Sequence, residues 1–135
     1  MDDKYRLLII AALVGFIGDA LTQLAMNKKI VHLAGLEEYF QRHGKVESMF
    51  IASAILSLFY AIYLMLNLPL KWYYLAIYGI VLDIIFRRFR VFPSLDKFYS
   101  SYNYLQTGLM ATAIPFVLPI IINNAINIII PASKV

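Results

Sequence analysis

Two carboxylates lie inside apolar segments, where an ionisable side chain costs about 2.5–3.5 kcal/mol on membrane-insertion scales and therefore marks a candidate site. Gln23 follows Asp19 by one helical turn, and Arg87 follows Asp83 at the same spacing. Residues four apart share a helix face, so Asp83 is placed to pair with Arg87, and Gln23 is placed to hydrogen-bond across helices. Two interpretations stay open. Each acid is neutralised by a nearby arginine and holds helices together, or both acids form a proton or ion relay.

Side-chain sets for other chemistry are missing from the sequence. His32 and His43 occur in one loop without the His-x-x-His or His-Glu spacing of a metal site. The chain has no cysteine, which excludes disulfides, thiol chemistry and cysteine-ligated zinc. The sequence also lacks a nucleophile elbow and a phosphate-binding loop. We therefore expect no enzymatic activity, no cofactor and no bound metal.

Membrane-spanning helices must position the two carboxylates, because the chain is 61% hydrophobic and only 15% charged. A soluble domain has about 45–50% apolar and about 25% charged residues. A helix needs about 20 mostly apolar residues to cross a bilayer. Four segments fit this requirement, at residues 7–26, 48–66, 72–89 and 105–122. We expect a single all-α domain over residues 1–135, an integral membrane protein whose four transmembrane helices form an antiparallel bundle.

Small residues and prolines predict how these spans pack. Small residues at helical spacing let backbones approach closely in lipid, and they recur in the first two spans at Ala11, Gly15, Gly18, Thr22, Ser53, Ser57 and Ala61. The short turn at residues 67–71 predicts an antiparallel hairpin of spans two and three. Pro115 and Pro119 each remove a backbone hydrogen bond, which predicts a bend near residues 116–118. We interpret it as a kink that shapes the helix, because transporters pair their broken helices and no second broken span occurs here.

The two long loops, residues 27–47 and 87–104, each hold four of the twelve Lys and Arg residues. By the positive-inside rule this places both long loops on the cytoplasmic side and both termini on the luminal or external side. Residues 31–43 of the first loop mix apolar and charged side chains, which is equally typical of a helix lying in the membrane interface and of an ordinary surface helix.

The second loop carries the candidate contacts to lipid headgroups or to partner proteins, which are Arg87, Arg88, Arg90, Asp96 and Lys97. A basic cluster directly after a span is typical of a topology anchor and of contact with anionic lipid. We therefore expect no nucleic-acid partner.

The stretch from Asp83 to Pro119 has an Asp- and Arg-rich span end, then Phe-Pro-Ser-Leu-Asp, an aromatic run, and Ile-Pro and Leu-Pro in the last span. This order resembles small multispanning proteins of large DNA viruses that have a lipid membrane beneath an icosahedral shell. The resemblance implies a structural protein of the virion inner membrane, or a membrane-embedded minor capsid protein. Its long loops would then contact the capsid or other membrane proteins.

The residues Gly18, Asp19 and Gln23 match the pattern Gly-Asp-x-x-x-Gln. This pattern is similar to the first-span motif of the Mpv17/PMP22 family of four-span organelle proteins, which form or regulate pores. The chain lacks the Trp- and Pro-bearing C-terminal signature of that family. The similarity implies an alternative function, a small pore or transporter centred on Asp19, Gln23 and Asp83.

Overall fold

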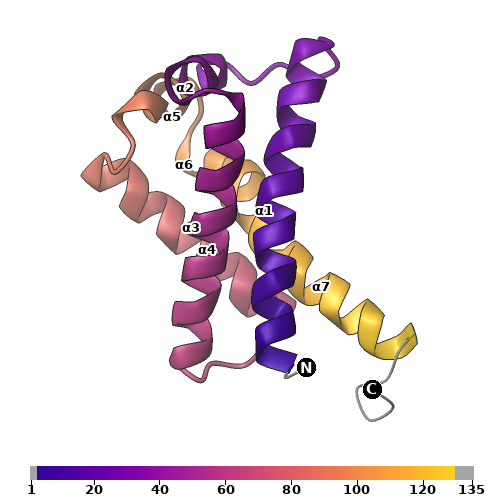
Figure 1. Ribbon diagram of the computed structural model, residues 1–135. Coiled ribbons are helices and arrows are strands. Elements are labelled where there is room, and N and C mark those ends of the chain that lie inside the picture. The colour runs from indigo at the N-terminus through magenta and orange to yellow at the C-terminus, as the bar shows by residue number, and fades with distance from the viewer. Residues whose placement is uncertain (1–2, 130–135) are drawn as a thin grey trace.

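The computed structural model describes residues 3–129, and every regular element within them is a helix (Figure 1). The expected all-α fold is confirmed for this part of the chain; residues 1–2 and 130–135, which include both termini, lie outside it. In chain order the elements are α1 (Asp3–Asn27), α2 (Leu36–His43), α3 (Lys45–Met65), α4 (Trp72–Phe89), the 3₁₀ turn η1 (Pro93–Leu95), α5 (Asp96–Ser101), α6 (Tyr104–Thr107), the π-helix η2 (Gly108–Ala113) and α7 (Ile114–Ile129).

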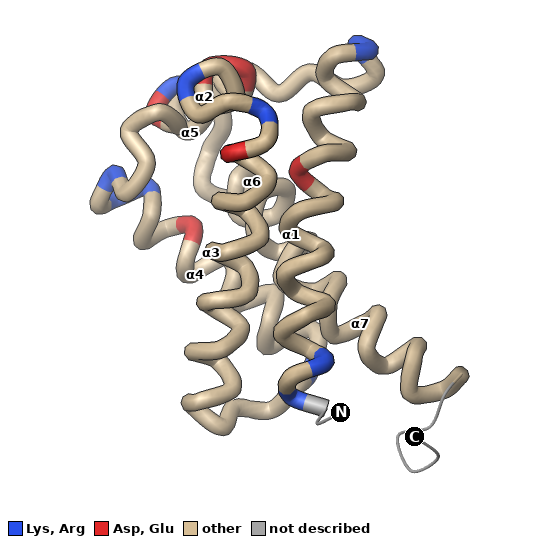
Figure 2. The backbone as a smooth tube through the Cα atoms, in the orientation of Figure 1, with Lys and Arg blue, Asp and Glu red and all other residues tan. Residues whose placement is uncertain are grey.

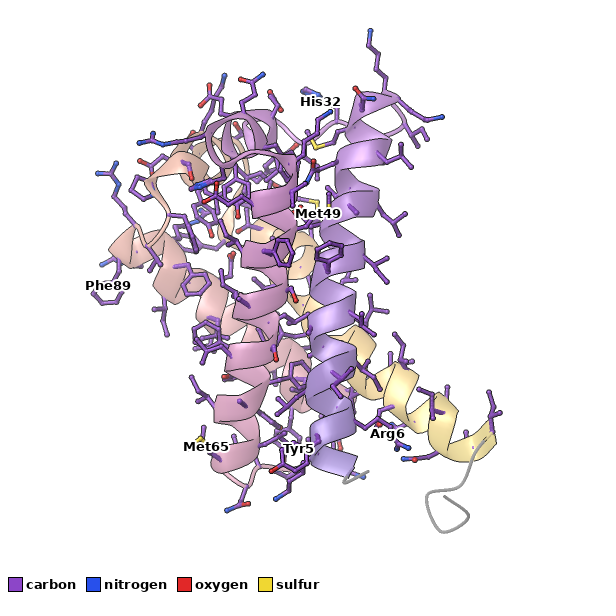
Figure 3. All side chains as sticks on the ribbon, viewed as in Figure 1. Tyr5, Arg6, His32, Met49, Met65 and Phe89 are labelled. Atoms are coloured by element: carbon purple, nitrogen blue, oxygen red, sulfur yellow. The ribbon has the colours of Figure 1, made fainter. Side chains whose placement is uncertain are left out.

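Within the described residues, three helical stretches are long and apolar enough to cross a membrane, namely Lys4–Asn27, Lys45–Met65 and Tyr104–Ile129. Large apolar side chains point outward from these helices, as Met65 does at one end of α3 (Figure 3). Helix α4 has the predicted bounds, but its 18 residues include Asp83, Arg87 and Arg88. By length and composition, three of the four predicted spans are therefore able to cross a membrane.

The long helices form two closely packed pairs. Helix α1 packs most extensively on α3, and α4 packs on η2 and α7. A Cβ atom on Gly15 would lie 2.6 Å from the carbonyl oxygen of Ala52 in α3, and one on Gly79 would lie 2.9 Å from the carbonyl oxygen of Thr112 in η2. Only glycine permits backbones to approach so closely, so these two positions set the spacing within each pair.

Helices α3 and α4 form the antiparallel hairpin that the short turn predicted (Figure 1), but they are not closely packed on each other. Their backbones make few contacts. Long aromatic side chains join them instead. The rings of Tyr63 and Tyr78 lie 5.1 Å apart, and the Tyr78 hydroxyl donates to the carbonyl of Phe59 at 2.7 Å. Large side chains on the facing surfaces keep the helices apart, whereas Gly79 turns the close-packing face of α4 toward η2.

A buried apolar core joins the two pairs. Its members come from all four long helices and are Leu7, Ala11, Leu56, Tyr60, Tyr63, Leu75, Leu82, Phe116 and Ile120. The ring of Tyr60 stacks on Phe116 with centroids 5.9 Å apart, and the Tyr60 hydroxyl donates to the Phe116 carbonyl. Burying the polar end of Tyr60 therefore leaves no unpaired hydroxyl.

The irregular helix geometry that the structure shows lies before residues 116–118, where the sequence predicted a bend. Helix α7 continues through Pro119, and the irregular geometry lies earlier, in the π-helix Gly108–Ala113. There the amide of Ile114 donates to the carbonyl of Leu109, five residues back. A proline ring clashes with the carbonyl four residues before it, which for Pro115 is that of Ala111. The wider π-turn contains Ala111, so the distortion precedes the proline instead of following it.

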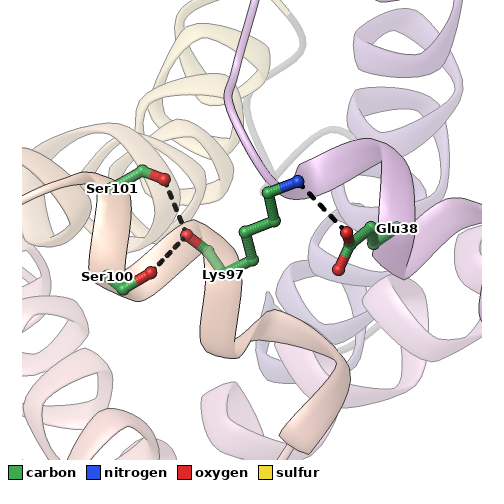
Figure 4. Close-up of polar contacts among 4 residues, drawn as sticks. All are labelled: Glu38, Lys97, Ser100 and Ser101. Atoms are coloured by element: carbon green, nitrogen blue, oxygen red, sulfur yellow. Dashed lines mark hydrogen bonds and ion pairs between the residues drawn. The ribbon is translucent and has the colours of Figure 1, made fainter.

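The two long loops fold together beyond one end of the helices, opposite the start of α1 and the end of α7 (Figure 1). We call this region the loop cap and define it as residues 31–43 and 91–103. The Lys97 ammonium pairs with Glu38 at 3.2 Å, and the Lys97 carbonyl accepts bonds from Ser100 and Ser101 (Figure 4). Charged residues gather at this end of the molecule (Figure 2).

Backbone and ring contacts also hold the loop cap together. The amide of Ala34 donates to the Tyr102 hydroxyl at 3.1 Å, and His43 Nε2 is hydrogen-bonded to Ser94 Oγ at 2.8 Å. Gly35 has a φ of 86°, a conformation that L side chains rarely adopt. The helix expected within residues 31–43 is therefore α2, and it belongs to a folded cap instead of an isolated loop.

Candidate functional site around Asp19 and Asp83

Asp19 joins α1 to the start of α3. Ser48 Oγ lies 3.0 and 2.9 Å from its two carboxylate oxygens, and Gln23 Nε2 donates to Oδ2 at 2.7 Å. The same Gln23 nitrogen lies 3.0 Å from the carbonyl oxygen of Lys45, so Gln23 also bridges the two helices. Among residues 3–129, no arginine forms an ion pair with Asp19. The expectation of an arginine partner is therefore wrong for this acid, and neutral donors satisfy it.

Asp83 is fully buried on α4 and is bound through Thr107. The Thr107 hydroxyl donates to Asp83 Oδ2 at 2.8 Å and accepts a bond from Arg87 Nη2 at 3.0 Å. The other carboxylate oxygen, Oδ1, has no partner among the described residues. A direct ion pair between Asp83 and Arg87, which the four-residue spacing predicted, does not form. The Thr107 hydroxyl connects the two charges instead.

Arg87 points inward and is half-buried. Its Nη2 donates to the carbonyl of Tyr102 at 2.9 Å, and its guanidinium carbon lies 4.3 Å from the ring centroid of Tyr104 and 5.0 Å from that of Tyr99. Such cation–π contacts are strongest where water is excluded. Burial raises the pKa of Tyr99, so its hydroxyl stays protonated at neutral pH. Arg87 therefore contacts its own chain, although the sequence also suggested it as a partner contact.

The two acids occupy equivalent places in the two helix pairs. Each follows the close-approach glycine of its own helix by four residues, in Gly15-x-x-x-Asp19 and Gly79-x-x-x-Asp83. Each is hydrogen-bonded to a hydroxyl on the helix packed against it, Ser48 for the first and Thr107 for the second. Sequence reasoning missed both hydroxyls. The repeated Gly-x-x-x-Asp pattern was the signal that could have found them.

A single cavity of about 400 Å³ contains both acids. Its walls come from α1, α3, α4, η2 and α7, and they include Gly15 and Ala52, where α1 touches α3. Five aromatic side chains of the loop cap also line it: Tyr39, Phe40, Phe92, Phe98 and Tyr99. The sequence placed both acids toward the same end of the helices, but only the structure shows that they share one space.

The other predicted contacts lie on the surface of the molecule. Arg90 forms an exposed ion pair with Asp96, whose hydrogen bond raises the pKa of Arg90. Lys97 pairs with Glu38, and Arg88 is exposed. Exposed ion pairs contribute little to stability, so these side chains can exchange their partners easily.

A second polar contact lies at the opposite end of the helices. Arg6 Nε donates to Asn123 Oδ1 at 2.8 Å, and Arg6 Nη2 donates to Asn127 Oδ1. These bonds join α1 to α7. Asn123 and Asn127 therefore serve a contact between helices, and neither residue lines the cavity.

Comparison with known proteins adds no relative: no family model, no curated protein and no solved structure matches the chain. Within residues 3–129, no group of three or more His, Cys, Asp or Glu side chains is arranged to hold a metal ion. The cavity and the loop cap are therefore the two features of the molecule that indicate a function.

Proposed function

We propose that the chain is a structural multi-pass membrane protein that crosses the bilayer four times, with α4 as the additional span. The contacts of its polar residues support this assignment. Asp83 and Arg87 form their hydrogen bonds within the protein, to Thr107 and to the Tyr102 carbonyl, while the exposed side chains of α4 include Ile77, Val81 and Ile84. Arg88 lies in the last turn, where a long basic side chain reaches the interface by extending its charged end.

The proposed orientation follows from the basic residues of the two long loops. These loops lie at one end of the helices, and the turn between α3 and α4 lies at the other (Figure 1). The positive-inside rule then assigns the loop cap to the cytoplasmic side and both termini to the luminal side.

The observation that carries the structural role is the folding of two loops, far apart in sequence, into one cap beyond the apolar helices. Contacts across 59 and 68 residues, from Lys97 to Glu38 and from Tyr102 to Ala34, hold it together. A folded cap presents its charged side chains at fixed positions, which favours docking to another protein. The resemblance to virion inner-membrane proteins makes the capsid the proposed partner, with the cap facing outward and the helices anchored in lipid. In this role the protein requires neither enzymatic activity nor a cofactor, and it binds no nucleic acid.

Photo-cross-linking in intact particles tests this role. A benzophenone amino acid is placed at Arg88 or Lys97 in the exposed basic region, and at Met65 beside the α3–α4 turn as a control. Met65 is 80% exposed, and Arg88 and Lys97 are exposed as well, so all three positions are accessible to a partner. The proposal expects adducts with a capsid protein from Arg88 and Lys97 only, identified by mass spectrometry. Adducts with lipid alone, or equal capture from Met65, would contradict it.

One observation favours the alternative of a small pore or transporter, namely that Asp19 and Asp83 line the same cavity. Flux measured in proteoliposomes tests it. Asp19→Asn and Asp83→Asn should each abolish ion or solute movement if the carboxylates form the path. The absence of any flux through the unaltered protein would exclude this function.

A further inference from the structure

The cavity between the helix pairs has the properties of a ligand site, which a membrane anchor does not require. Its volume of about 400 Å³ lies within the range of small-molecule pockets, about 300–1,000 Å³. The close approaches at Gly15 and Gly79 fix the spacing of the helices that form its walls, and Gly15 is part of the lining. Most of its lining is apolar, and its charged groups are few.

The charges of the cavity favour a cation. The formal charges of Asp19, Asp83 and the neighbouring Arg87 leave one net negative charge. Asp83 is fully buried, and its Oδ1 atom has no hydrogen-bond partner among the described residues. A buried carboxylate oxygen without a donor is costly, and a bound donor or cation would remove that cost.

The aromatic side chains favour an organic cation over a metal ion. Tyr39, Phe92 and Phe98 line the same space as the two acids. Aromatic rings attract ammonium groups, and sites for quaternary ammonium ligands are built from such rings. Divalent cations prefer six or more oxygen ligands, and within residues 3–129 no cluster of three acidic or histidine side chains occurs.

We propose that this cavity binds a monovalent organic ammonium group, attracted by the negative charges of Asp83 and Asp19. The aromatic side chains of the loop cap contact the alkyl groups around the nitrogen. The ammonium belongs either to a free small molecule or to the headgroup of a choline lipid, because the recognition chemistry is the same. This binding is independent of the docking of the loop cap to a capsid.

Binding of benzyltrimethylammonium to the protein in phosphatidylglycerol nanodiscs tests the proposal by calorimetry. We expect saturable binding, and affinity at least about tenfold weaker in Asp83→Asn, because one partner of a buried charge pair is lost. Glu47→Gln removes an exposed carboxylate at the same end of the molecule and should leave the affinity unchanged. Phenylmethanesulfonate, of similar size and opposite charge, should not bind.

A second pair of variants keeps both carboxylates and tests the aromatic contact. Tyr39→Leu should weaken binding several-fold, whereas Tyr39→Phe keeps the ring and should bind as the unaltered protein does. Circular dichroism confirms that each variant is folded. Repeating the titration in phosphatidylcholine nanodiscs identifies the source of the ammonium. Weaker apparent affinity there means that the lipid headgroup occupies the site, and equal affinity means that a free molecule does.

Three results would overturn the proposal. They are the absence of saturable binding by the unaltered protein, equal affinity in folded Asp83→Asn, and equal binding of the sulfonate. None of them bears on cross-linking from the loop cap, so failure of this proposal and failure of the structural role are distinguishable.

Discussion

Replacing Thr107 with valine removes one hydroxyl and nearly preserves the shape of the side chain. That hydroxyl is the only described donor to Asp83, and it also accepts a bond from Arg87. Losing a hydrogen bond to a charged group costs about 1.5–3 kcal/mol. The variant also loses the bond from Arg87 to the Thr107 hydroxyl. Because Arg87 keeps its bond to the Tyr102 carbonyl and its contacts with two rings, we expect this second loss to cost the ~0.6 kcal/mol that is average for bonds between membrane helices. Thr107→Val should therefore lower the free energy of unfolding by about 2–4 kcal/mol.

Thr112→Val is the matched control. Thr112 is buried in the following π-helix, and its hydroxyl donates to the Gly108 carbonyl of its own helix at 2.8 Å. Its removal leaves no buried charge unpaired and should cost less than about 1 kcal/mol. Unfolding of both variants in mixed micelles, titrated with dodecyl sulfate and followed by circular dichroism, measures the difference. If Thr107→Val were as stable as Thr112→Val, Thr107 would not be the group that holds Asp83.

Two further predictions use the same titration. Gly15→Ala places a methyl group against the α3 backbone and should lower the free energy of unfolding by about 1–3 kcal/mol. Gly18→Ala is the control, because a methyl group there meets no atom within 4 Å and should be neutral or stabilising. Equal effects of the two substitutions would refute the close approach at Gly15. Burial raises the pKa of Tyr39 and of Tyr99 above that of an unfolded tyrosine, about 10. Their contribution to the free energy of unfolding should therefore be fully present at neutral pH and be lost as the pH rises above about 10. Tyr99→Phe should reduce that fall, and an unchanged pH profile would contradict the assignment.

The sequence predicted the limits of the long helices well, because their ends carry strong signals. Trp72 and the arginine cluster after Ile85 bound α4 at the predicted residues, Trp72–Phe89. The charged residues between Met26 and Ser48 likewise separate α1 from α3, with bounds within a few residues of those predicted. Hydropathy and charge act locally along the chain, so a linear reading detects them.

The pairing of the helices was not predictable in the same way. The short turn suggested α3 and α4 as packing partners, but Gly79 directs the close-packing face of α4 toward Thr112. A lone glycine in a span does not indicate which helix it will face. The π-helix was not predicted for a different reason: the clash of Pro115 acts on the preceding turn, so the irregular geometry lies at residues 108–113.

Asp19 and Asp83 each accept a hydrogen bond from a hydroxyl group, but only Asp19 has partners for both of its carboxylate oxygens among the described residues. This difference indicates a structural role for Asp19 and a further, functional role for Asp83. Asp19 uses both of its oxygens, with bonds to Ser48 and Gln23, as expected of a group that only holds α1 to α3. Asp83 has the same glycine one turn before it and a comparable hydroxyl partner, yet one of its oxygens stays buried and unpaired beside the cavity that the residue lines. If helix association were the only role of both acids, a second donor to Asp83 would be as favourable as Gln23 is to Asp19. Asp19→Asn should therefore act mainly on stability, and Asp83→Asn mainly on ligand binding.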